Sequence, residues 1–165
     1  MRFYLSVAME HAKESNASRK KAVREYLEGL GHYVLDPFDL PQREAKNYLG
    51  IEDESTIPSM KNYFGEDETR HAMRFIISND MVEVNKANCV ILFYDKGVQK
   101  GAGSLAEAWE AYREGKPLYV FTELTLKDVP SWLIGESTKI FYSLENLLTY
   151  LKNTEQLERD IMLGQ

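Results

Sequence analysis

The chain has 165 residues, of which 44% are hydrophobic and 28% are charged, a composition typical of one soluble globular domain. Its net charge of −6 disfavours non-specific binding to the phosphate backbone of nucleic acids, so we expect no nucleic-acid partner. The single cysteine excludes a disulfide framework, and three histidines without zinc-ligand spacing argue against a catalytic metal.

The N-terminal part of the chain predicts a strand, a helix and a second strand. Arg2–Met9 is typical of a strand whose alternate residues face opposite sides of a sheet. This run is too short and wrongly flanked for a signal peptide or a membrane span, so we expect a cytoplasmic protein. Polar residues around Asn16 can cap a helix that continues to about Leu30 and closes at Gly31. His32–Asp36 is predicted as a second, short strand.

Residues 39–67 form a long irregular segment with prolines, glycines, mixed charges and scattered aromatic residues. A connection of this length inside a compact domain is usually functional or disordered, and its aromatic residues argue against plain disorder. We therefore interpret 39–67 as a lid-like insertion over a site, within one domain that spans residues 1–165.

The next predicted helix, Glu68–Ala87, carries an acid among its apolar positions. Asp80 falls between Ile77 and Val84 on the stripe that should face the core. A carboxylate among core positions needs a partner. Asp80 is therefore either a site residue or an edge carboxylate bonded to neighbouring backbone.

Residues 88–120 predict a strand, a glycine-rich turn, a helix and another strand. Cys89–Tyr94 is continuous and rich in β-branched residues, as expected of a strand buried on both faces of a parallel sheet. The buried setting raises the pKa of the Cys89 thiol and argues against a catalytic cysteine. The helix ends at Gly115, and the whole unit is a right-handed crossover.

The turn and helix after this strand hold the main candidate residue. Gly101 and Gly103 supply a flexible turn, and Ser104 is placed to cap the helix. Glu107 falls in the first turn of that helix, near the carboxyl end of the strand, where open α/β sheets bind ligands. The alternative is an acid favoured at a helix N-terminus by the macrodipole.

The C-terminal part of the chain predicts two more strands and a helix. Leu118–Thr122 is the fourth strand, a loop follows, and Lys139–Tyr142 is the fifth. Ser143 can cap a helix whose leucines share one face. The charged tail, residues 152–160, either extends this helix or lies on a partner subunit.

Strands that alternate with helices predict an α/β fold, namely a flavodoxin-like doubly wound five-stranded parallel sheet of order 2-1-3-4-5 in a single domain. The switch point of this order lies between the first and third strands, with Asp80 approaching from the preceding helix. The residues expected to converge there are Tyr4, Ser6, Ala8, Asp95 and Glu107.

The familiar cofactor motifs are missing from the sequence. It contains no P-loop, no complete dinucleotide fingerprint and no serine nucleophile elbow, so we expect no cofactor. What remains is a carboxylate site with tyrosines and small residues. A carboxylate can attack an anomeric carbon because departure of a base develops oxocarbenium character there.

The run GSLAEAWEAYREGKP resembles the nucleoside 2-deoxyribosyltransferase family, and FYLSVAM, GHYVLDP and the helix with Asp80 are similar to that family in the same order. The resemblance implies that Glu107 is the nucleophile, that Asp80 handles the base and that Tyr4 is the site tyrosine. It also implies a nucleoside or nucleotide substrate and a homodimer or higher homo-oligomer. The predicted substrate contacts are Ser6, Ala8, Arg19, Asp95, Gly101, Gly103 and Ser104.

Three functions stay open under this resemblance. Gly101 and Glu110 depart from the family pattern, which weakens transfer between free nucleosides more than glycosidic cleavage. A related branch hydrolyses nucleoside 5′-monophosphates, and a phosphate could bind at the N-terminus of the first helix. The residues for that pocket are Ser6, Ser15, Ser18 and Arg19, for which plain capping and a solvated basic face are the alternative. The third function is a non-catalytic nucleotide-binding or sensing module.

Overall fold

The computed structural model describes residues 1–8, 14–37, 61 and 64–164. Its five strands pair in parallel in the order β2-β1-β3-β4-β5, which confirms the predicted fold class and strand order. The strands are β1 (Arg2–Val7), β2 (Tyr33–Leu35), β3 (Cys89–Phe93), β4 (Leu118–Phe121) and β5 (Lys139–Phe141). Each ends one or two residues before its predicted end.

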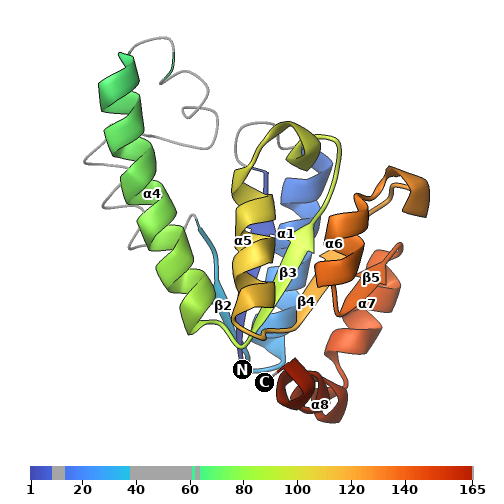
Figure 1. The fold of residues 1–165 in the computed structure, drawn as a ribbon. Helices are drawn as coiled ribbons and strands as arrows, with labels where there is room; N and C mark the ends of the chain where they lie inside the picture. The colour runs from blue at the N-terminus through green and yellow to red at the C-terminus, as the bar shows by residue number, and fades with distance from the viewer. Residues whose placement is uncertain (9–13, 38–60, 62–63, 165) are drawn as a thin grey trace.

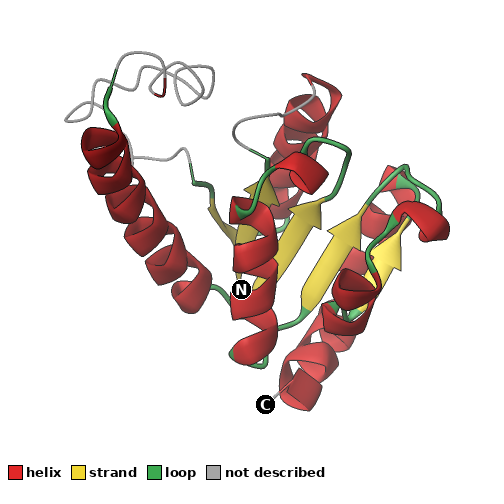
Figure 2. Cartoon of the chain, turned by 45° about the horizontal axis from the view of Figure 1, so that its top comes forward, coloured by secondary structure: helices red, strands yellow, loops and turns green. Residues whose placement is uncertain are grey.

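Helices cover both faces of the sheet (Figures 1 and 2). One face packs against α1 (Glu14–Gly29), α7 (Leu144–Leu151) and α8 (Thr154–Gly164). The other packs against α4 (Glu66–Lys86), α5 (Gly103–Arg113) and α6 (Ser131–Glu136). Two short 3-10 helices complete the described elements, η1 (Val98–Lys100) and η2 (Leu126–Asp128). None of the described helices is long and apolar enough to cross a membrane.

The two faces of β1 belong to two different cores. Phe3 and Leu5 pack with side chains from α1, α7 and α8, whereas Tyr4 and Ala8 pack with side chains from α4, α5 and α6. This confirms the predicted alternation along β1. Since Ser6 alternates with Leu5, it lies on the same face as Tyr4, below α5.

Several local predictions were wrong or lie beyond the described residues. Ser131–Glu136 forms a helix where a loop was predicted, because six residues are too few to show a helical period. The charged tail does not extend α7 but forms a separate helix, α8, whose Leu157 is fully buried in the chain's own core. The alternative, a contact with a partner subunit, stays a prediction. The proposed insertion 39–67 lies outside the described residues except for Lys61 and 64–67.

A buried carboxylate fixes α8 on the sheet. Asp160 accepts hydrogen bonds from the Tyr119 hydroxyl at 2.8 Å and the Tyr150 hydroxyl at 2.6 Å. Its other oxygen accepts a bond from Gln156 Nε2 at 2.8 Å. Burial and the nearby carboxylate raise the pKa of both tyrosines, so both hydroxyls stay protonated donors.

We expect Asp160→Ala to lower the free energy of unfolding by about 2–3 kcal/mol, because it leaves the buried Tyr119 hydroxyl without an acceptor. Chemical denaturation measures the effect. Glu158→Ala, an exposed position on the same helix, is the matched control and should change stability by less than about 0.5 kcal/mol. Equal effects of the two variants would contradict the role assigned to Asp160.

Candidate active site

Glu107 lies in the second turn of α5, not the first as predicted, because the helix already begins at Gly103. The predicted cap was also wrong. Ala102 is the N-cap residue and no side chain caps the helix, whereas Ser104 is a buried residue within the first turn. Ser104 lies two residues after the N-cap position, inside the helix, so its side chain does not cap the free N–H groups.

Two hydroxyl groups of β1 hold the Glu107 carboxylate. The Tyr4 hydroxyl donates to Oε1 at 3.0 Å, and the Ser6 hydroxyl donates to Oε2. The glutamate is only 5% exposed. Each oxygen therefore has a fixed donor, and the carboxylate bridges α5 to the neighbouring face of β1.

Burial raises the pKa of Glu107, because a carboxylate loses its hydration inside the protein. The hydrogen bonds from Ser6 and Tyr4 and the charge of Lys20 act in the opposite direction. Burial, together with the charges of Glu107 and Asp80, raises the pKa of Tyr4 well above its ordinary value. Tyr4 therefore remains a neutral hydrogen-bond donor to Glu107.

A pocket of about 420 Å³ opens beside Glu107. One wall is α4, and the opposite wall is the glycine-rich turn before α5. A Cβ atom added at Gly101 or Gly103 would have no atom within 4 Å, so both glycines border open space. The lining residues that α4 contributes are Met73, Ile77, Asp80 and Met81.

The apolar stripe predicted on α4 is only partly a core face. Ile76 and Val84 are buried, but Ile77 is 52% exposed and lines the pocket with Met73 and Met81. Figure 1 shows why, since α4 leans away from α5 toward its N-terminal end. Side chains that a closely packed helix would bury therefore face the pocket.

Asp80 keeps its predicted place among the buried positions of α4 and is 4% exposed. It lines the same pocket as Glu107, and its charge acts on Tyr4. Two carboxylates from different helices therefore border one cavity. Their roles toward a substrate stay predictions.

The structure brings several other predicted residues to this pocket and leaves some outside it. The predicted residues that line the pocket are Ala8, Gly101, Gly103 and Ser104. Ser6 does not line it but donates a hydrogen bond to Glu107, which does. Among the predicted phosphate contacts, Ser18 is exposed, and the side chain of Ser15 lies outside the described residues.

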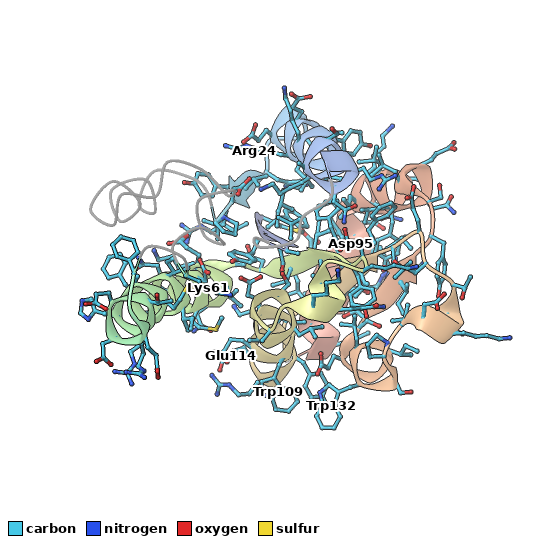
Figure 3. The ribbon with its side chains drawn as sticks, turned by 90° about the horizontal axis from the view of Figure 1, so that it is seen from above. Arg24, Lys61, Asp95, Trp109, Glu114 and Trp132 are labelled. Atoms are coloured by element: carbon cyan, nitrogen blue, oxygen red, sulfur yellow. The ribbon has the colours of Figure 1, made fainter. Side chains whose placement is uncertain are left out.

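Asp95 organises the turn after β3. One of its oxygens accepts bonds from the backbone N–H groups of Gly97 at 2.6 Å and Val98 at 3.0 Å, and the other accepts from Asn16 Nδ2 at 2.8 Å. Asp95 is not among the residues that line the pocket. In Figure 3 it lies well apart from Lys61, which is next to α4.

Arg19 also has its contacts away from the pocket. Its guanidinium pairs with Glu123, donates to Asn16 Oδ1 at 3.1 Å and lies over the Phe121 ring at 5.6 Å from the ring centre. These contacts place its charge on the α1 side of the sheet, where Phe121 belongs to the core.

Sequence reasoning missed the cationic residues of the site. Lys61 and Lys100 line the pocket, and the buried Lys20 acts electrostatically on Glu107. The position of Lys100 beside the glycine-rich turn was a usable signal. The sequence gave no such signal for Lys20, since a lysine in a helix is usually solvated. Cys89 is buried as predicted, and burial raises the pKa of its thiol to about 12.

No protein-family model matches the sequence, and no curated protein matches it either. Among solved structures, the fold is similar to a 2-deoxyribosyltransferase from Bacillus psychrosaccharolyticus, with a TM-score of 0.64 and 18% identity over 95% of this chain and 96% of that one. It is also similar to the CMP N-glycosidase of Clostridium botulinum, with a TM-score of 0.50 and 17% identity over 92% of this chain and 98% of that one. These matches confirm the resemblance noted in the sequence at the level of the fold.

We expect Glu107→Gln to raise the free energy of unfolding at pH 8. A carboxyl group whose pKa is raised in the folded protein costs stability as the pH rises above its unfolded value, and the amide removes that cost. The gain should shrink as the pH falls and the native glutamate becomes protonated. Denaturation of both proteins at several pH values measures it.

Glu110→Gln, on the same helix, is the control, for which we expect the opposite change in the free energy of unfolding. The hydrogen bond from Arg113 lowers the pKa of Glu110, so its carboxylate favours the folded state above its unfolded pKa. This variant should lose a little stability at pH 8, since solvent screens a pair with the exposed Arg113. A loss of stability in Glu107→Gln at all pH values would contradict the cost assigned to the buried charge.

Proposed function

We propose that the chain is an enzyme that cleaves the N-glycosidic bond of nucleosides or deoxynucleosides through a covalent glycosyl–Glu107 intermediate. The observation that carries this proposal is a buried carboxylate, held by hydroxyl groups at both oxygens, on the wall of a pocket that also contains Asp80. The likeness in fold to a 2-deoxyribosyltransferase and a CMP N-glycosidase supports it.

The first step forms the glycosyl ester. A carboxylate oxygen has two acceptor sites, so Glu107 can keep its bonds to Tyr4 and Ser6 and still present a lone pair to the sugar. That lone pair attacks the anomeric carbon while the bond to the base breaks and its electron pair goes to the base. Asp80, acting as the acid, donates a proton to the departing base.

The second step releases the sugar. Water or another base attacks the anomeric carbon, the ester bond to Glu107 breaks, and Asp80 takes the proton of the incoming group. Two displacements retain the configuration of the sugar. Water gives hydrolysis, and a second base gives transfer.

A specific observation favours a second candidate, a nucleoside 5′-monophosphate N-glycosidase. Lys100 and Lys61 line the pocket that contains the two acids, and Lys100 is exposed to solvent. A phosphate group on the substrate would gain charge-assisted hydrogen bonds there. The contacts of Arg19 with Glu123 and Asn16 make it the weaker candidate for that phosphate.

We expect Glu107→Gln to abolish turnover of 2′-deoxynucleosides and 5′-monophosphates, since an amide cannot form the ester. Asp80→Asn should reduce the rate by about 10²–10⁴-fold through loss of the acid. Chromatography of released base, with and without a second free base, measures hydrolysis and transfer. Intact mass spectrometry of quenched Asp80→Asn should detect the glycosyl–enzyme.

Glu110→Gln is the control for these variants and should keep full activity, because it lies on α5 outside the pocket. Full activity of Glu107→Gln would refute the nucleophile. Binding of a nucleotide without cleavage by the wild-type protein would favour the sensing module instead.

We expect Lys100→Ala to raise KM for 5′-monophosphates by about tenfold, the value of one lost charge-assisted hydrogen bond, and to leave KM for free nucleosides unchanged. Lys96→Ala is the matched control, because Lys96 is exposed in the same loop but does not line the pocket. An equal change for both substrate classes would remove the argument for a phosphate at Lys100.

A further inference from the structure

The pocket wall opposite α4 is a turn with little packing around its glycines. It connects β3 to α5, and its residues that line the pocket are Gly97, Val98, Lys100, Gly101 and Ala102. A Cβ atom added at Gly101 or Gly103 would meet no atom within 4 Å, so close packing does not fix this end of the turn. The contacts at the start of the turn, next to β3, therefore matter most for the position of the wall.

Three N–H groups at the start of this turn donate to Asp95. Its Oδ1 accepts from the backbone N–H groups of Gly97 at 2.6 Å and Val98 at 3.0 Å, and its main-chain oxygen accepts from that of Gln99 at 3.3 Å. Hydrogen bonds to a carboxylate are stronger than those between neutral groups. Gly97 and Val98 line the pocket, so Asp95 is bonded directly to the wall without lining the cavity itself.

Asn16 holds the second oxygen of this carboxylate. Its Nδ2 donates to Asp95 Oδ2 at 2.8 Å, and both side chains are buried. Its Oδ1 accepts a hydrogen bond from Arg19 at 3.1 Å, and the Arg19 guanidinium pairs with Glu123 after β4. Because both ends of the Asn16 amide are bonded, a rotation by 180° would turn its NH₂ group toward Arg19. These contacts join α1 and the segment after β4 to the pocket wall.

We propose that Asp95, held by Asn16, is a positioning residue that fixes this wall of the pocket for substrate binding. The inference rests on the proposed function of the pocket. Glu107 has its own hydrogen bonds from Tyr4 and Ser6, which do not involve the turn. Loss of the bond between Asp95 and Asn16 therefore weakens substrate binding and leaves the chemical step largely intact.

The test exchanges the donor and the acceptor of this bond in the full chain. At pH 8, Asn16→Asp places two carboxylates against each other, and Asp95→Asn places two NH₂ groups against each other. Each single variant therefore loses the bond. The double variant restores it in reverse, because the amide at position 95 donates to the carboxylate at position 16, which still accepts from Arg19.

The functional readout is the split between KM and kcat for the fastest substrate among the four natural 2′-deoxynucleosides and their 5′-monophosphates. In each single variant KM should rise by about tenfold, while kcat stays within about threefold of wild type. In the double variant KM should return to within about twofold of wild type. Should one single variant fail to fold, the other single variant and the double variant decide.

Amide hydrogen exchange reports on the wall without substrate. The N–H groups of Gly97 and Val98 should exchange about tenfold faster in the single variants than in the wild-type and double-variant proteins, because their acceptor is no longer held in place. Unchanged exchange at both N–H groups in folded single variants would overturn the proposal.

Asn88→Ala is the matched control. Asn88 lies next to the other end of β3, where its Oδ1 accepts from the backbone N–H of Arg2 at 2.8 Å, and it does not line the pocket. This variant should keep the wild-type KM and the wild-type exchange at Gly97 and Val98. A lower free energy of unfolding in the single variants with an unchanged KM would reveal a purely structural pair and overturn the proposal. A double variant with a KM no better than the single variants would do the same.

The failure of the proposed function has a different signature. A wild-type protein that binds dAMP, dCMP, dGMP or TMP without cleaving it would refute the glycosidic reaction. The Kd from calorimetry then takes the place of KM, and the same pattern across the three variants supports the role of Asp95. A wild-type protein that neither binds nor cleaves any of these substrates would overturn both proposals.

Discussion

The candidate site depends on the hydrogen bonds that hold the buried Glu107 carboxylate. Its two oxygens accept hydrogen bonds from Tyr4 and Ser6, which are about a hundred residues earlier in the chain. Burying a carboxylate is unfavourable, and these two donors and the charge of Lys20 offset part of the cost. The same contacts dock α5 on β1, so the helix position and the carboxylate geometry are set together.

Among the described residues, the elements around Glu107 leave the pocket open. Asp95 accepts hydrogen bonds from Gly97 in the turn after β3 and from Asn16 of α1. These bonds fix the chain that leads into the glycine-rich turn. On the opposite side α4 leans outward, which leaves Met73 and Ile77 facing the cavity (Figure 1). A helix packed fully against α5 would bury these side chains and fill the space beside the two carboxylates.

The fold and the proposed reaction have different support. The likeness to a 2-deoxyribosyltransferase and an N-glycosidase, at 17–18% identity, describes the architecture. A doubly wound sheet hosts many activities, so the reaction has to be argued from the site. The groups around the cavity support the reaction: the Tyr4 and Ser6 donors at Glu107, Asp80 on α4, and the exposed Lys100.

The sequence by itself determined the strand order, the alternation along β1 and the two helix ends at Gly31 and Gly115, whose φ values of 81° and 64° favour glycine. These features follow from local periodicity and from the handedness of crossovers. It also singled out Glu107 and Asp80 as candidates. Tertiary structure alone decided that Asp95 bonds to Asn16 of α1 and that Tyr4 and Ser6 hold Glu107, because both outcomes depend on contacts between distant segments whose relative tilt no local pattern encodes.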